Sequence, residues 1–170
     1  MKKVLFLLGH LTDLDIEWMI RNGQKLQISE QDFLIHKGEA PEDLYIILSG
    51  ELTIRDQDKV IATIGPGEIV GEMSFLEARP PAVNVIASED CEIYSISKKL
   101  VTERLEKDPT FKANFYYSLA LFLSDRLRKT TSQLGFGSPE EEDRIDTNVM
   151  EGISQAGARF SQILHKFSEI

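Results

Sequence analysis

The residues best suited to chemistry lie between positions 65 and 87, in the run GPGEIVGEMSFLEARPPAVNVIA. A Gly-Pro-Gly turn leads to Gly71, then to a short run of helix-compatible residues and a stretch that contains proline. Glycine lets the backbone approach a ligand closely, and free N–H groups at the start of a helix attract negative charge. The pattern therefore predicts a cradle for an anion such as a phosphate.

The rest of the sequence contains no pattern typical of a catalytic or metal-binding site. The three histidines, His10, His36 and His165, are far apart in the sequence and lack the spacing of metal ligands. Cys91 is isolated from all of them. Glu72 has the chemistry of a general base, yet no partner acid or nucleophile lies beside it in the sequence. We therefore expect no enzyme activity, no metal site and no cofactor.

The composition is that of one folded domain of ordinary size with an appendage. The chain has 170 residues, a net charge of -9 and a pI of about 4.9. Negative charge disfavours nucleic acids and anionic membranes, so we expect protein or small-molecule partners instead. The apolar run at the N-terminus is too short for a signal peptide or a membrane span. A single cysteine excludes an internal disulfide, and we expect a cytoplasmic location.

The elements that must position the cradle follow from the hydrophobic periodicity. The run from Thr12 to Gly23 has an N-cap, one apolar face and a stop signal, which together predict a short helix. The apolar pattern then changes to period two, which is typical of strands. Strands are expected around residues 26–28 and 33–35, on both sides of Ser49-Gly50, from residue 59, and over 82–87 and 92–96. Many short strands between turn residues favour a sandwich or a barrel.

Two helices are expected after the last strand. Ser97 is suited to cap the first helix, and Pro109 suits the first turn of a longer helix that continues to Leu134. Apolar residues recur along this longer helix at three- and four-residue steps: Phe115, Leu119, Phe122, Leu123, Leu127 and Leu134. We expect a small roll to cover only part of this stripe, so that the helix over 109–134 forms a homodimer. The alternative is a helix that folds back on its own roll.

The composition changes after the domain over residues 1–134. Residues 135–148 are rich in Gly, Ser, Pro and acids, which is typical of a linker. Residues 149–170 regain helical periodicity, with an apolar face made by Val149, Ile153, Ala156, Phe160, Ile163 and Phe167. Two glycines weaken this helix by about 1 kcal/mol each, so we expect it to form when docked on a protein partner. The region is too short and too acidic for a DNA-binding domain.

The run from Gly71 to Ala87 resembles the phosphate-binding cassette of the cyclic-nucleotide-binding domain family, G-E-(apolar)-(A/S)-(apolar)-L-x-x-x-P-R-(A/S)-A-T-V-x-A. The matching residues are Gly71, Glu72, Met73, Ser74, Leu76, Pro80, Ala82, Val85 and Ala87. The runs YIILSGEL and IGPGE also resemble family signatures, and the similarity covers about residues 11–134. It implies a mainly β fold with helices: a double-stranded β-helix, or jelly-roll-like β-roll, flanked by an N-terminal helix and C-terminal helices. It further implies a sensor domain like that of the catabolite activator protein, without the DNA-binding domain.

The resemblance also implies which residues bind a ligand, with cAMP or cGMP as the expected molecule. Glu72 matches the glutamate that accepts the ribose 2′-hydroxyl, and Ala82 matches the small residue beside the phosphate. The other cassette candidates are Gly71, Met73, Ser74 and Asn84. Thr130 and Thr131 fall where the bacterial transcription-factor branch places base-contacting hydroxyls; the alternative is that they are surface or capping residues.

Pro81 departs from the family pattern. The family places at this position the arginine that binds the cyclic phosphate, whereas proline has neither a charge nor a donor. A charge-assisted hydrogen bond contributes roughly 1.5 to 3 kcal/mol, so we expect affinity to fall by about a hundredfold or more. Arg79 offers a replacement, because residues two apart in an extended stretch point to the same face. The alternative is that Arg79 is a solvated loop residue.

Two functions remain open on these grounds. In the first, a cyclic nucleotide or a related phosphate ligand occupies the cassette, and the helices after Ser97 shift in response. In the second, the roll has lost its ligand and serves as an interaction or scaffold module, with the apolar face over 149–167 binding a partner. Glu72 favours the first function, and Pro81 favours the second.

Overall fold

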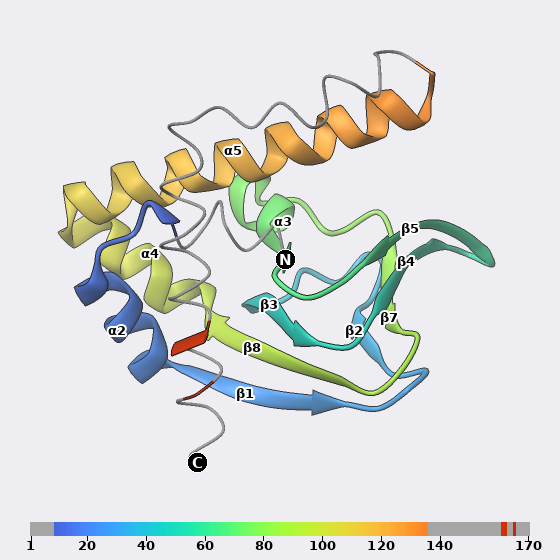
Figure 1. Ribbon diagram of the computed structural model, residues 1–170, viewed down its shortest axis with the longest axis horizontal. Coiled ribbons are helices and arrows are strands. Elements are labelled where there is room, and N and C mark those ends of the chain that lie inside the picture. The colour runs from blue at the N-terminus through green and yellow to red at the C-terminus, as the bar shows by residue number, and fades with distance from the viewer. Residues whose placement is uncertain (1–8, 136–160, 163–164, 166–170) are drawn as a thin grey trace.

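The protein is a β-roll with helices at one end, as seen in a computed structural model that describes residues 9–135, 161, 162 and 165 (Figure 1). Two antiparallel sheets of four strands each make up the roll. Helices α2 (Asp13–Asn22) and α4 (Lys98–Lys107) lie at one end of the strands. Helix α5 (Pro109–Gln133) crosses above the short helix α3 (Glu72–Glu77). The mainly β fold with flanking helices is confirmed.

The strands alternate between the two sheets along the chain. One sheet has the order β1 (Gly23–Ile28), β8 (Cys91–Ser97), β3 (Asp43–Ser49) and β6 (Ile69–Val70). The other has the order β2 (Phe33–Ile35), β7 (Asn84–Ala87), β4 (Leu52–Asp56) and β5 (Lys59–Ile64). Among the described strands, only β4 and β5 are consecutive in the chain and neighbours in one sheet, so each sheet depends on the other to form.

Two strands differ from the sequence-based expectation. β7 begins at Asn84 rather than at Ala82. Pro80 and Pro81 precede it, and proline has no N–H to donate to a sheet, so the ladder starts after them. β6 was not expected, because two residues carry no periodicity; it exists because Ile69 and Val70 pair with β3.

The core has two parts. Between the sheets, Ile47, Leu52 and Ile93 are fully buried. Between the roll and the helices, Leu44 and Ile69 belong to a second buried cluster, which includes the following residues of α2, β8, α4 and α5: Ile16, Met19, Tyr94, Ile96, Val101, Leu105, Phe111, Phe115, Leu119 and Phe122. The helices are therefore seated on the roll by apolar burial, which contributes about 25 cal/mol per Å² of apolar surface.

The predicted apolar stripe of α5 is divided between the core and the surface. Phe115, Leu119 and Phe122 are buried against the roll, whereas Leu127 and Leu134 are 67% and 71% exposed. The roll thus covers the first part of the stripe only, as expected from the length of the helix. Asp108 caps α5, since its Oδ1 accepts the N–H of Phe111 at 2.9 Å. Ser97 precedes α4 as predicted, although its hydroxyl makes no capping hydrogen bond.

A buried ion pair joins α2 to α4. Asp15 is 3% exposed, and its Oδ1 lies 2.6 Å from Nη2 of Arg104. The same guanidinium lies 4.7 Å from the ring centre of Trp18 and 4.8 Å from that of Phe111. Asp15 also closes a capping box with Thr12 at the start of α2. One arginine therefore contacts α2 and α5 from its place on α4.

The region after α5 lies largely outside the described residues. This holds for the predicted linker beyond Gly135 and for most of the predicted helix over 149–170, so the division into these segments stays a prediction. Ser161, Gln162 and His165 are described; they are helical and exposed. No helix within the described ranges is long and apolar enough to cross a membrane.

We predict that Asp15→Asn lowers the free energy of unfolding by about 2 kcal/mol at pH 7, since it removes a charge-assisted hydrogen bond. Burial raises the pKa of Asp15, but the hydrogen bonds from Arg104 and Thr12 outweigh it and hold the pKa below 3.8. Because the pKa of Asp15 is lowered in the fold, its ionised carboxylate stabilises the protein at pH values above 3.8. This stabilisation is lost as the pH falls further. Urea unfolding at pH 7 and pH 3 should therefore show a larger difference in stability between the wild type and Asp15→Asn at pH 7.

Glu17→Gln is the matched control, because Glu17 forms an exposed ion pair with Arg21 on the same helix. Such a pair contributes about 0.5 kcal/mol or less. An equal loss of stability in both variants would contradict the role given to Asp15.

Candidate functional site

The short helix α3 starts at a glycine that the backbone requires. Gly71 has a φ of +89°, a left-handed conformation that side chains rarely tolerate. A Cβ at this position would also lie 3.1 Å from the carbonyl oxygen of Asp43. Gly71 therefore lets the chain turn from β6 into α3 while it packs closely against the start of β3. The six-residue helix lies where the sequence predicted it.

Glu72 is buried at the start of α3 and is bound by a residue of α5. It is 2% exposed, and its Oε1 lies 2.6 Å from Nη1 of Arg126. Nη2 of Arg126 donates to the carbonyl oxygen of Ile69 at 3.2 Å. The guanidinium also lies 4.5 Å from the ring centre of Phe122. One arginine thus links the glutamate of the cassette, the strand before it and the helix above it.

Arg126 was missed by the sequence analysis, although a signal for it exists. The buried face of α5 contains Phe115, Leu119 and Phe122, and Arg126 is the next residue at the same three- and four-residue steps. An arginine at a position that continues a buried face needs a buried partner. The predicted stripe continued through the apolar residues Leu123 and Leu127 and therefore passed over Arg126.

Four charged groups meet where β3, α3, α4 and α5 converge. Burial raises the pKa of Glu72, and the charge of Arg126 and the backbone N–H groups of Glu72 and Met73 offset only part of this rise. Burial lowers the pKa of Lys98 at the start of α4, while the charges of Glu72 and Asp43 act in the opposite direction. Asp43 accepts a hydrogen bond from the Ser95 hydroxyl at 2.5 Å. The cluster has balanced charge and is suited to holding a polar group.

Among the described residues, no cation is held in place at the end of the cassette where the sequence predicts a phosphate. Arg79 is exposed, and its side chain forms no hydrogen bond or ion pair with the part of the chain that the structure describes. Pro81 accepts the N–H of Gly38 through its carbonyl oxygen at 2.8 Å, and Oδ1 of Asn84 accepts the N–H of Lys37 at 2.7 Å. These contacts fasten the loop after β2 to the end of the cassette. Asn84 therefore has a structural role here.

The remaining candidates are spread over two elements. On the cassette, Met73 and Ala82 are exposed and Ser74 is half-buried. On α5, the hydroxyls of Thr130 and Thr131 donate to the carbonyl oxygens of Arg126 and Leu127 at 3.0 and 2.9 Å. Both threonine hydroxyls are thus hydrogen bonded within their own helix. The structure brings Glu72 to α5 through Arg126, whereas the hydrogen bonds of the two threonine hydroxyls stay within α5.

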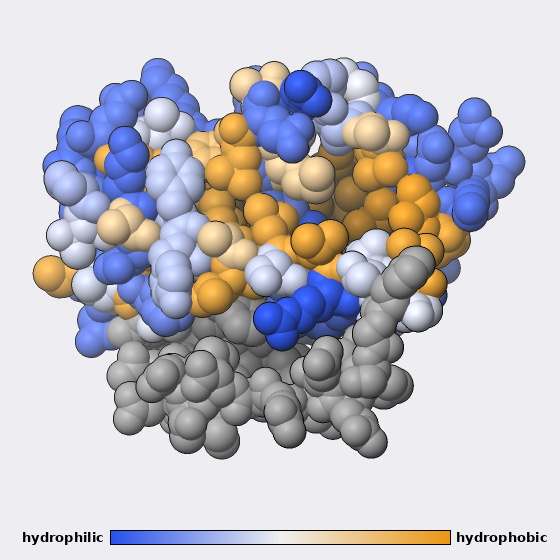
Figure 2. All heavy atoms as spheres, turned by 90° about the horizontal axis from the view of Figure 1, so that it is seen from above, coloured by the Kyte–Doolittle hydropathy of each residue, from blue (hydrophilic) through white to orange (hydrophobic). Residues whose placement is uncertain are grey.

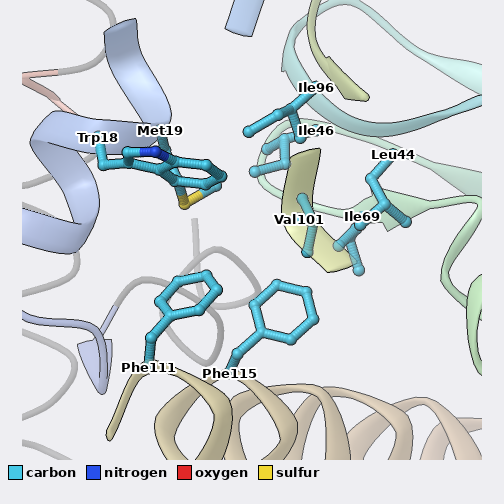
Figure 3. A pocket seen from close by; sticks show the side chains of 9 residues that line it. All are labelled: Trp18, Met19, Leu44, Ile46, Ile69, Ile96, Val101, Phe111 and Phe115. Carbon is cyan, nitrogen blue, oxygen red and sulfur yellow. The ribbon is translucent and has the colours of Figure 1, made fainter. Parts of the chain in front are cut away.

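A small cavity lies away from the cassette residues just described. It has a volume of about 10 Å³ and lies between α2, the roll and α5. Figure 3 shows Trp18 and Met19 on one side and Phe111 and Phe115 on the other. This apolar space has about the size of one water molecule, so it is a packing gap and not a nucleotide site. Within the described ranges, no group of three His, Cys, Asp or Glu residues is placed to hold a metal ion.

Comparisons with known proteins agree with this architecture. Residues 25–108 match the family model described as "Cyclic nucleotide-binding domain". The chain is 27% identical over 124 residues to the voltage-gated delayed rectifier potassium channel KCNH1 of Rattus norvegicus, covering 72% of this chain and 13% of the channel. It is 27% identical over 138 residues to the cyclic AMP receptor protein of Thermus thermophilus, covering 78% of this chain and 62% of that protein. The chain thus spans less than two thirds of either relative.

A solved structure shows the same fold. The cyclic nucleotide-binding domain from Methylobacillus flagellatus superposes with a TM-score of 0.68 at 19% sequence identity. The match covers 80% of this chain and 86% of that chain. At this level of identity the similarity concerns the arrangement of sheets and helices.

We predict that Arg126→Met lowers the free energy of unfolding by about 3 kcal/mol at pH 7, because it leaves the Glu72 carboxylate buried without its partner. The pKa of Glu72 is already above 4.5 and should rise further in this variant. A raised pKa favours the fold at low pH and destabilises it as the pH rises through that pKa. Urea unfolding between pH 4 and pH 8 should show a loss of stability that grows with pH.

The double variant Glu72→Gln/Arg126→Met should recover most of this stability and should lose the pH dependence. Arg128→Met is the control, since Arg128 is an exposed arginine on the same helix. A decrease in stability in Arg128→Met as large as that in Arg126→Met would contradict the role given to the ion pair. So would a decrease in Arg126→Met that does not depend on pH.

Proposed function

Since this chain belongs to the cyclic nucleotide-binding domain family, we propose that it is a non-enzymatic regulatory module that senses a cyclic nucleotide or a related phosphate ligand. The observation that carries this proposal is the ion pair between Glu72 and Arg126. It couples the cassette directly to α5. A ligand that binds Glu72 therefore weakens the interaction that keeps α5 on the cassette. The signal then passes through the helices that follow the roll.

The proposed mechanism is a competition for one carboxylate. A ribose 2′-hydroxyl donates a hydrogen bond to Glu72, with the backbone near Gly71, Met73 and Ser74 around the sugar and phosphate. Because Glu72 is 2% exposed and already bound, the ligand gains access only when α5 rearranges near Arg126. A ligand shifts such an equilibrium by the difference between its affinities for the two conformations. The energetic link between ligand and helix is therefore built into the site.

The phosphate end of the proposed site depends on Arg79. Its side chain is exposed and has no partner among the described residues, so it is available to a phosphate beside Ala82. The base would extend toward the end of α5, where Thr130 and Thr131 can share their hydroxyls with a ligand. Asn84 holds the loop at Lys37 and contributes to the shape of the phosphate end.

A second candidate is a ligand-free module that serves for protein interaction or as a scaffold. Two observations favour it: Pro81 has no donor for a phosphate, and the carboxylate of Glu72 is already satisfied by Arg126. In this case the closed cassette is the permanent state, and the roll is a rigid support for its helices. Under either candidate we propose a cytoplasmic protein that binds neither nucleic acid nor membrane. A protein partner at residues 149–170 and a homodimer through residues 109–134 remain part of the proposal.

We predict that calorimetric titration with cAMP and cGMP detects binding to the wild-type protein and that Arg79→Ala weakens it about tenfold or more, because one charge-assisted interaction is lost. Pro81→Arg should tighten binding by about a hundredfold. Arg21→Ala is the control, because Arg21 is an exposed arginine on α2. Its affinity should equal that of the wild type.

The same titration separates the two candidates. Absence of heat with the wild type, together with binding gained in Pro81→Arg, would exclude a cyclic-nucleotide sensor and support the ligand-free module. Binding by the wild type that Arg79→Ala leaves unchanged would overturn the assignment of Arg79.

A further inference from the structure

The strand β5 forms an open edge of the second sheet. It is the last strand of that sheet, and among the described strands only β4 pairs with it. Five of its six residues are exposed, with Val60 and Ile61 at 49% and 53%. A one-residue register shift leaves Ile61 without a partner on β4. Figure 2 looks down on this end of the molecule and shows apolar side chains beside the hydrophilic turn of the β4–β5 hairpin.

The edge of the other sheet offers a direct comparison. β1 also has six residues and is the last strand of its sheet. It contains Gln24, Lys25 and Gln27, and Nζ of Lys25 lies 3.0 Å from Oε1 of Glu92 on the neighbouring strand. Lysine is a common protection of sheet edges against pairing with another chain. In β5 the only charged residue is Lys59, at its start, so β5 is the edge better suited to accept another strand.

An arginine is held in place one strand in from this edge. Nε of Arg55 on β4 donates to Oγ1 of Thr53 at 3.0 Å, and the Thr53 hydroxyl donates to the carbonyl oxygen of Ile86 at 3.4 Å. Thr53 lies on the opposite face of β4 from the buried Leu52, yet it is only 7% exposed, which fits an arginine side chain that lies over it. The two Nη groups of Arg55 form no hydrogen bond or ion pair with the part of the chain that the structure describes.

The charge of Arg55 lacks an acid in its own surroundings. Asp56, the next residue in the chain, is bound by Nζ of Lys37 at 2.7 Å. The residues that pair with Arg55 across the sheet are Asn84 on β7 and Val60 on β5, and neither is charged. Arginines that are held in place beside apolar residues are common hot spots of protein interfaces. The missing acid is therefore expected from a partner.

The shape of the edge and the charge of Arg55 together select the occupant. Only an extended polypeptide presents N–H and C=O groups at the spacing of a strand edge. An added strand lies about 5 Å from β5 and about 10 Å from β4, a distance that the side chains of a glutamate and of Arg55 can close together. A second copy paired through β5 about a twofold axis brings another Arg55 and no acid. A nucleic acid is repelled by the net charge of -9.

We propose that β5 is the docking site of an extended, acidic segment of a partner protein, which adds a strand along Lys59–Ile64 and places a carboxylate on Arg55. Main-chain hydrogen bonds supply affinity in this mode of binding, and side chains supply specificity. Here Val60 and Ile61 favour apolar residues in the segment, and Arg55 favours an acid between them. The ion pair of Glu72 and Arg126 takes no part, so the proposal stands or falls independently of nucleotide binding.

A double-mutant cycle between the chain and a synthetic peptide tests this proposal. The probe is a capped six-residue peptide of alternating valine and glutamate, and its matched version has glutamine in place of glutamate. By fluorescence anisotropy, the wild type should bind the glutamate peptide about tenfold more tightly or better, because Arg55 gains a charge-assisted hydrogen bond. Arg55→Gln should bind both peptides equally. Arg128→Gln is the control, since Arg128 is an exposed arginine on α5, and it should keep the preference of the wild type.

Hydrogen exchange on the same samples locates the peptide. Amides of residues 59–64 should gain protection, whereas those of β1 should not. Failure of the wild type to bind either peptide, equal binding of both peptides, or a preference that persists in Arg55→Gln would overturn the proposal. So would protection at β1 instead of β5, or protection of β5 without peptide that grows with protein concentration, since a second copy would then fill the edge. Protection at Ile47 and Ile93 in the roll checks that each variant is folded.

Discussion

Glu72 carries a carboxylate into a part of the fold that water barely reaches. Moving such a charge out of water costs several kcal/mol unless an opposite charge and hydrogen bonds compensate. Arg126 supplies both, and it can do so only while α5 lies across α3. The left-handed backbone at Gly71 sets the position of the carboxylate, and Ile69 accepts the second bond of the arginine. The packing of the cassette and the position of the second half of α5 thus depend on one ion pair.

This constraint gives the proposed sensor a physical basis and also limits it. In the proposed site, Glu72 is the acid that would bind the sugar, while Pro81 stands where a cation for the phosphate would be expected and the exposed Arg79 is nearby in sequence. A ligand must therefore replace the ion pair between Arg126 and Glu72 at one end of the proposed site. At the other end it gains only a weaker contact with the exposed Arg79. Such a site responds to a ligand whose affinity exceeds that of Arg126 for Glu72. Without that ligand, the same contact holds the domain closed as a rigid module.

Much of the architecture could be predicted because local signals agree with the fold. Thr12 caps α2, Pro109 starts α5, and the period-two runs became strands. The short helix after Gly71 was also expected. Pairs that are distant in sequence could not be found in this way: Asp15 with Arg104, and Glu72 with Arg126. Hydropathy treats an arginine as a surface residue, and its partner becomes evident only when two elements are packed together.

The central claim is that Glu72 holds the second half of α5 on the cassette. Hydrogen exchange along α5 tests it most directly, by comparing Glu72→Gln with the wild type. The account predicts exchange about tenfold faster at residues 126–133, where the charge-assisted bond is weakened, and unchanged exchange at residues 115–122, where the core holds the helix. Equal rates along the whole helix in both proteins would contradict the account.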